Sequence, residues 1–209
     1  MWLVAFTGVL SLSTIGLWVA TRDSVKIAKA ALTDIERAFV FSDFDIVPSG
    51  NNGHLTGWTI TPKWKNGGNT RAKHLYSHVS WDHFPGALPE DFTFPDLMLP
   101  EMAEEHSATF IPAGGVVTND LIEIPVELLD AARMGFVRIF IWGWTEYDDI
   151  FERSPPHRTE FCNEIVVTRD PYNPAVRCLG LRIISKHTGA DGDCYRQARP
   201  ANKRHEPFT

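Results

Sequence analysis

The sequence predicts a mainly β protein: an immunoglobulin-like β-sandwich with one short helix, preceded by an N-terminal transmembrane helix and a helical stalk. Three observations support this prediction. An uncharged apolar run opens the chain, a helical spacing of apolar residues follows it, and from residue 38 onward apolar runs alternate with Gly, Pro and Asn turns. We therefore divide the chain into a transmembrane helix (1–20), a stalk (21–37), a sandwich domain (38–185) and a loose polar tail (186–209).

The apolar run at the N-terminus predicts a membrane anchor. Residues 2–20 (WLVAFTGVLSLSTIGLWVA) contain no charged side chain, and Trp2 and Trp18 stand near the two ends. At about 1.5 Å per residue, a helix of this length approaches the roughly 30 Å of a bilayer core, and indoles favour its interfaces. A cleaved signal peptide is the alternative, but no basic side chain precedes the run, and LWVA places Trp18 where a small residue is needed. We expect residues 2–20 to contact membrane lipid.

Basic residues follow the apolar run and do not precede it. Arg22, Lys26 and Lys29 come within ten residues of its end. Because positive charge near a membrane helix is retained in the cytoplasm, we expect the N-terminus outside and the body in the cytoplasm.

The next segment, SVKIAKAALTDIERAF, has helical periodicity. Its apolar residues step by three and four, as in the seam of a coiled coil: Val25, Ala28, Leu32, Ile35 and Phe39. Two heptads are short for a stable coiled coil. An amphipathic stalk resting on its own domain or on the membrane surface is one interpretation, and self-association through the helix and stalk is the other.

The body reads as a series of strands. Alternating segments at 38–47, 55–65 and 72–84 are separated by the turns SGNNGH and NGGNT, and short strands are expected in SATFIP and GGVVT. IPVELLDAARMG predicts the one helix of the body, with Gly135 at its C-terminal cap. FVRIFIWGWTEYDDIF is apolar on both faces, which is typical of a central strand, and we expect Trp142 or Trp144 to face the interior. HRTEFCNEIVV returns as its antiparallel partner, and CLGLRII adds an edge strand.

Composition excludes some functions and indicates a docking surface. A net charge of −6 argues against a nucleic-acid binder, and three cysteines without a CxxC pair indicate a reducing compartment and no zinc site. Charge is uneven, because the stretch from residue 74 to residue 132 holds 11 acidic residues and no Lys or Arg. A solvated acidic loop is one interpretation. The other is a surface for a basic partner, with Glu101, Glu104 and Glu105 in a Pro-rich loop as the candidate partner-binding residues.

Metal and cofactor sites are not expected. His74 and His78 share a strand face but lie about 13 Å apart, too far for one ion even with His83 nearby. The segment DGD (191–193) lacks the other ligand positions of a calcium loop.

Catalysis is not expected either. His157 and Cys162 are five residues apart on one predicted strand, so they face opposite sides and cannot form a nucleophile–base pair, although Asp148 and Asp149 lie at the same hairpin. No hydrolase, phosphate-loop or dinucleotide motif occurs in the sequence. We therefore predict no catalytic residues and a non-enzymatic protein, with Cys162 as a small core residue.

Two motifs carry a resemblance. WKNGGNT (64–70) and WGWTEYDDIF…HRTEFC (142–162), behind a membrane helix and stalk, resemble uncharacterised bacterial membrane-anchored proteins that share a W-x-N-x-G-x-T turn and a G-x-x-x-Y-x-D-x-F…H-x-T-x-F-C hairpin. Arg71 departs from the Pro expected after the first motif. The resemblance implies a bacterial inner membrane location, and it suggests motifs that fix strand register rather than perform chemistry.

The leading functional hypothesis is a single-pass membrane-anchored protein whose cytoplasmic sandwich binds another protein. An accessory subunit of a larger membrane complex is the alternative. A hydrolase-type enzyme with a site assembled from distant strands is the second alternative.

Overall fold

The computed structural model describes residues 2–51, 54–95, 109–151, 154–200 and 202, without the side chains of residues 2–7, 9–12, 30 and 34. The chain separates into two compact units, residues 1–37 and residues 38–209.

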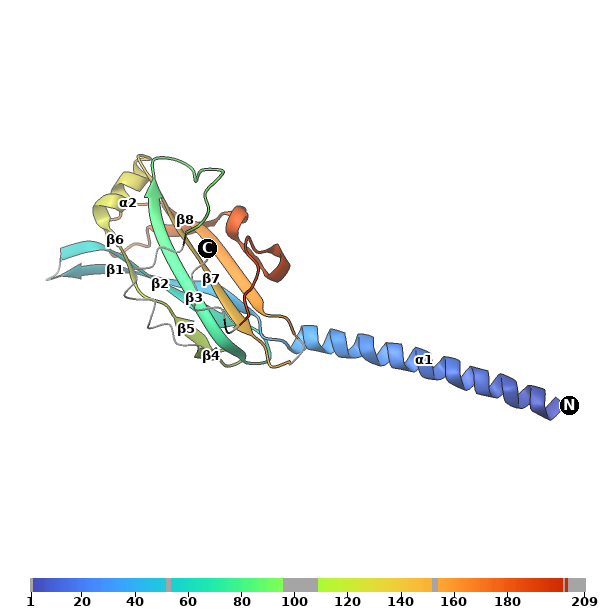
Figure 1. Ribbon diagram of the computed structural model, residues 1–209. Helices are drawn as coiled ribbons and strands as arrows, with labels where there is room; N and C mark the ends of the chain where they lie inside the picture. The colour runs from blue at the N-terminus through green and yellow to red at the C-terminus, as the bar shows by residue number, and fades with distance from the viewer. Residues whose placement is uncertain (1, 52–53, 96–108, 152–153, 201, 203–209) are drawn as a thin grey trace. The chain divides into compact units, whose positions relative to one another are not determined.

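The first unit is one continuous helix. α1 (Trp2–Glu36) runs through both segments that the sequence divides into membrane helix and stalk (Figure 1). Its large apolar side chains, where described, expose 47–71% of their surface: Ile15, Leu17, Trp18, Val19, Val25, Ile27, Leu32 and Ile35. Among the residues that the structure describes, no helix has both the length and the hydropathy needed to cross a membrane.

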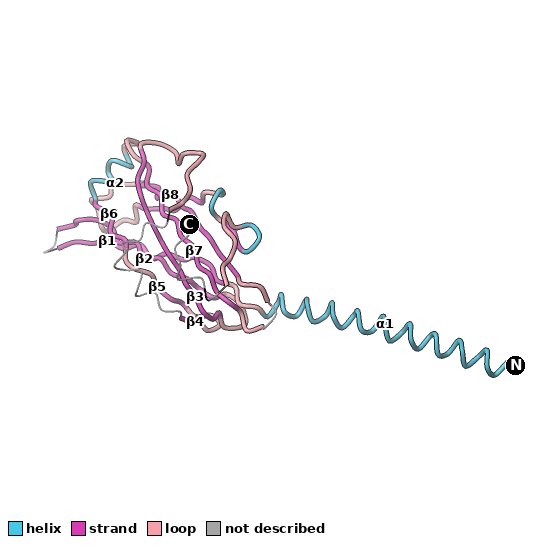
Figure 2. Tube along the Cα trace, viewed as in Figure 1, coloured by secondary structure: helices cyan, strands magenta, loops and turns pink. Residues whose placement is uncertain are grey.

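The second unit is mainly β and consists of two antiparallel sheets stacked as a sandwich (Figures 1 and 2). The first sheet contains β1 (Val40–Asn51), β2 (His54–Asn66), β5 (Val116–Thr118) and β6 (Ile122–Pro125). The second contains β3 (Ala72–Phe84), β4 (Thr109–Ile111), β7 (Arg138–Asp148), β8 (His157–Val167), β9 (Leu179–Ile183) and β10 (Gly189–Ala190). The helical elements are α2 (Val126–Arg133) and two 3₁₀ turns, η2 (Ser185–His187) and η3 (Asp191–Asp193).

The chain crosses between the sheets several times. β1 and β2 form a hairpin in the first sheet, β3 lies in the second, and β5 and β6 return to pair with β2. After α2, β7 enters the second sheet between β3 and β8. The expected helix is confirmed: Gly135 has a φ of +81°, and the Phe136 N–H donates to the Ala131 carbonyl, which closes a Schellman motif.

Alternating side chains of the two sheets meet in the core. β2 contributes Ile60 and Trp64, and the second sheet contributes Ile141 and Phe161, all at most 3% exposed. Gly143 lets this core close, because a Cβ there would lie 2.5 Å from the His78 carbonyl oxygen and 2.9 Å from the Phe161 ring.

β7 is the buried central strand that the sequence predicts. Its odd-numbered residues face the first sheet, so Trp142 and Trp144 both lie on the outer face of the second sheet, where both are nevertheless buried. The loop after β3 covers Trp142, with Phe92 and Phe94 against its ring and the Pro95 carbonyl accepting from Nε1 at 3.0 Å.

The expectation of a loose polar tail at 186–209 is wrong for its described residues up to 200. This segment lies along β8 on the same outer face (Figure 1). β10 pairs with β8, and the backbone N–H groups of Tyr195 and Arg199 donate to carboxylates of the sheet. The segment lacks periodicity because it is held by polar contacts with the sheet, which leave no apolar pattern in the sequence.

Candidate functional site

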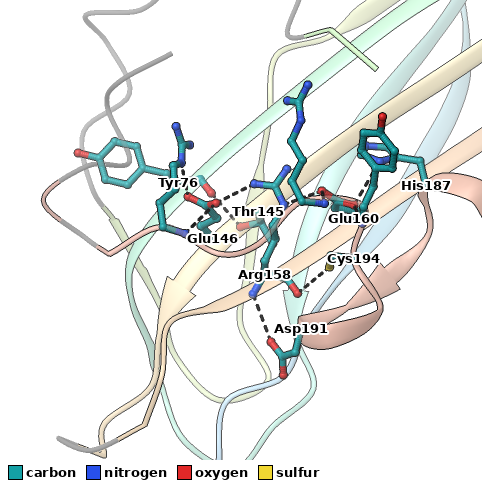
Figure 3. A network of polar contacts seen from close by, with 11 residues as sticks. Tyr76, Thr145, Glu146, Arg158, Glu160, His187, Asp191 and Cys194 are labelled. Atoms are coloured by element: carbon teal, nitrogen blue, oxygen red, sulfur yellow. Dashed lines mark hydrogen bonds and ion pairs between the residues drawn. The ribbon is translucent and has the colours of Figure 1, made fainter. Parts of the chain in front are cut away.

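A buried charge network lies on the outer face of β7 and β8. Register places Glu146 of β7 opposite Arg158 of β8, and Glu160 follows two residues later on the same face. Arg158 donates from Nη1 to Glu146 at 2.7 Å and from Nε to Glu160 at 2.6 Å, and all three side chains are fully buried. Figure 3 shows Arg158 lying between the two carboxylates. One cation therefore compensates two buried anions, so the two carboxylates need further hydrogen-bond donors from other parts of the chain.

The C-terminal segment supplies those donors. The N–H groups of Tyr195 and Arg196 donate to Glu160 at 2.6 and 3.3 Å, and Arg199 donates from Nε to Glu146 at 3.0 Å. Burial raises the pKa of Glu160, but nearby His187 and Arg158 outweigh that effect and hold the pKa below its ordinary value.

An indole completes this network. The guanidinium carbons of Arg158 and Arg199 lie 4.7 and 5.0 Å from the centroid of the Trp144 ring. Cations attract the face of an indole, most strongly where water is excluded. The network thus joins two strands and the C-terminal segment.

His157, which the sequence analysis considered for catalysis, lies between two carboxylates. Its Nε2 is 3.1 Å from Asp149 and its Nδ1 is 3.1 Å from Asp191, while the Ser154 hydroxyl lies 3.2 Å from Nε2. Burial lowers the pKa of His157, but hydrogen bonds and charge from Asp191 and Asp149 outweigh it and raise the pKa.

Ser154, His157 and Asp191 are thus connected in the order of a hydrolase triad. A triad histidine must be neutral to accept the proton of the serine. Here Asp149 lies against the same nitrogen that faces Ser154, and the two carboxylates raise the pKa of His157, which favours its protonated form over the neutral form that a triad needs. The arrangement ties the β7–β8 turn to η3.

The cysteines are thiols inside the protein. Cys162 is fully buried beside Phe140 and Trp142, as expected for a core residue, and burial raises its pKa to about 12. Cys194 donates to the Arg158 carbonyl at 3.3 Å, and burial raises its pKa to about 12 as well. Both are protonated at neutral pH and therefore weak nucleophiles.

The residues of the two sequence motifs have structural contacts. Asn66 is fully buried; its Nδ2 donates to the Thr70 and Ile111 carbonyls, and its Oδ1 accepts from the Phe39 N–H. In the hairpin motif, the Thr159 hydroxyl donates to the Val40 carbonyl at 2.7 Å. These contacts fix where β1 begins and where β2 ends.

The candidate partner-binding residues Glu101, Glu104 and Glu105 lie outside the described residues. The described acids of the same stretch are spread over different elements: Asp82 is on β3, Glu123 on β6 and Asp130 on α2. The structure therefore does not bring these acids together on one element.

The histidines considered for a metal site have different partners and do not form a shared site. His74 pairs with Asp148 at 2.8 Å, whereas buried His78 contacts the Ser80 hydroxyl at 2.7 Å. In the described part of the chain, no group of three potential ligands could hold a metal ion.

A groove of ≈ 410 Å³ lies beside β1, and the sequence analysis did not identify it. It is lined by residues 44–48 of β1, Trp58 of β2, and Pro174 and Arg177 of the β8–β9 connection. The groove combines residues more than 100 positions apart, so no local sequence pattern could have revealed it. The charge network left one signal in the sequence, the charged residues of HRTE in the first half of a strand that is buried along most of its length.

No protein-family model, curated protein or solved structure gives a significant match to this chain.

Proposed function

We propose that this protein is a single-pass membrane-anchored module whose sandwich binds another protein through the groove beside β1. The observation that carries the proposal is a concave surface next to the edge strand β1, in which apolar side chains such as Ile46 and Trp58 stand beside the charged Asp45 and Arg177. Among the described strands, β1 pairs only with β2. Edge strands and apolar clefts are the surfaces that extended protein segments bind.

Anchoring is proposed from the sequence of residues 2–20, which is uncharged, and from the exposed apolar side chains of α1. With Arg22, Lys26 and Lys29 after the run, we propose that the sandwich faces the cytoplasm of a bacterial cell, with the N-terminus outside. A protease added to intact spheroplasts should leave the sandwich intact. Digestion without lysis would contradict this orientation.

We also propose that the sandwich is immunoglobulin-like. The order β1-β2-β6 corresponds to strands A, B and E of that fold, and β3-β7-β8 corresponds to C, F and G. Backbone contacts between Trp58 and Ile124, measured by nuclear Overhauser effects, test the central B–E pairing on which this correspondence depends.

Photo-crosslinking in native membranes tests the binding function. Val47 lines the groove and exposes 51% of its surface, and Val116 on β5 exposes 48% but lies outside the groove. We expect benzoylphenylalanine at position 47 of the full chain to form a discrete protein adduct, and the same group at position 116 to form none. Identical adduct patterns at both positions, or no adduct at position 47, would contradict the proposal.

A further inference from the structure

The outward edge of β1 can be identified from two of its residues. The Val40 N–H donates to the Tyr147 hydroxyl, and the Val40 carbonyl accepts from Thr159, so the peptide groups of residue 40 point away from β2. Because peptide groups alternate along an antiparallel strand, those of Phe44 and Ile46 point the same way. The Phe44 N–H bonds to its neighbour, the Asp43 carboxylate, at 2.9 Å.

Those outward groups lie beside the groove. Phe44 and Ile46 are partly buried against the core and, together with Trp58, also line the groove. Pro48 closes one end of the edge, since it has no N–H to offer. A second strand could therefore pair with residues 44–46 and place one apolar side chain against Trp58.

Charge in the groove is unbalanced. Asp45 forms an ion pair with Lys63 of β2. Arg177 is exposed on the opposite wall, and among the described residues no carboxylate lies within ion-pair distance of it; its Nε is 3.4 Å from the Leu179 carbonyl oxygen. The groove therefore presents one uncompensated positive charge, which complements an acidic occupant.

We infer that the groove binds an extended protein segment that adds to the edge of β1 at Phe44 and Ile46, with an apolar side chain toward Trp58 and a carboxylate at Arg177. This inference rests on the proposed binding function and names the chemistry of the partner. Backbone pairing supplies the affinity, and the alternating side chains supply the selectivity.

Defined peptides test the inference with the full chain in detergent. The probes are fluorescein-labelled TVTLTET, its basic counterpart TVTLTKT, and TVPLTET, in which proline removes a pairing N–H. We expect the acidic peptide to bind about two- to fivefold more tightly than the basic one, as for an exposed ion pair. The proline peptide should bind more weakly than both, because it cannot complete the pairing.

A charge reversal provides the matched control. Arg177→Glu should invert the preference, so that TVTLTKT binds more tightly than TVTLTET, whereas Arg169→Glu, an exposed change in the same connection, should leave the preference unaltered. Equal binding of the acidic and basic peptides, no binding of any peptide, or equal binding of the proline peptide would each overturn the inference. A specific crosslink at position 47 together with such a result would retain the binding function and reject only this partner chemistry.

Discussion

The face of β7 and β8 that meets the first sheet packs apolar side chains such as Ile141 and Phe161, whereas the opposite face packs Arg158 between two carboxylates. Both faces are buried to a similar degree. The apolar face gains free energy by leaving water, while the charged face must first replace the hydration of each ion. The difference indicates that the apolar face tolerates conservative changes and that the charged face depends on every partner.

Removing the central cation should have the largest effect. Arg158→Met leaves Glu146 and Glu160 buried without their shared partner, and we expect the free energy of unfolding to fall by about 3–5 kcal/mol. Ile141→Val, on the apolar face, should cost only about 0.5–1.5 kcal/mol. Urea unfolding of the three proteins measures both. Similar losses in the two variants would show that the faces do not differ in this way.

Loss of Arg199 should cost less, because Arg158 still bonds to Glu146. We expect Arg199→Ala to lower the free energy of unfolding by about 1.5–3 kcal/mol, the usual range for a hydrogen bond to a charged group. It should also speed proteolysis of the C-terminal segment. Arg169 is exposed, and Arg169→Ala is the control, which should change neither the free energy of unfolding nor the rate of proteolysis. A variant at Arg199 that unfolds like the wild type would mean that the segment is held by its backbone contacts alone.

A substitution at Cys162 tests whether the aromatic cluster on the outer face tolerates a polar atom, although charged residues lie beside it. Cys162 lies among aromatic side chains on the outer face, next in the strand to the charged residues. Cys162→Ser should cost about 1–3 kcal/mol, because the hydroxyl is buried in an apolar cluster. Cys162→Ala keeps that cluster apolar and serves as the comparison. Rapid alkylation of the native Cys162 thiol would contradict its burial.

The comparison also shows what the sequence could predict. A run that is apolar on both faces predicted β7, and the turn after it predicted β8 as its antiparallel partner, because apolar burial leaves a pattern in the local sequence. Gly135 predicted the end of α2 because a glycine suits the C-terminal cap of a helix. The C-terminal segment left no such pattern, because its partners are carboxylates more than 30 residues away. The groove at Trp58 and Arg177 depends on the fold as a whole. Its residues come together only after both sheets have formed.

The smallest expected effect is the change in the free energy of unfolding with pH. It distinguishes His157, which titrates near neutral pH, from the charged network beside it, which does not. The folded-state pKa of His157 is raised above 6.5, so the imidazolium stabilises the fold at low pH, and this stabilisation is lost as the pH rises through the raised value. The carboxyl groups of Glu160 and Glu164 have lowered pKa values and stay ionised between pH 6 and pH 8. The thiols of Cys162 and Cys194, whose pKa is raised from 9.0 to about 12, stay protonated over this range in the folded state, and they remain largely protonated in the unfolded chain as well.

The free energy of unfolding should therefore decline gradually between pH 6 and pH 8, by less than the loss in Cys162→Ser. His157→Gln keeps hydrogen-bonding capacity but does not titrate, so its stability should vary less over this interval. Chemical denaturation at each pH measures both proteins. A wild type that gains stability with rising pH, or a variant with the same slope, would show that the link between Asp149 and Asp191 does not depend on a protonated His157.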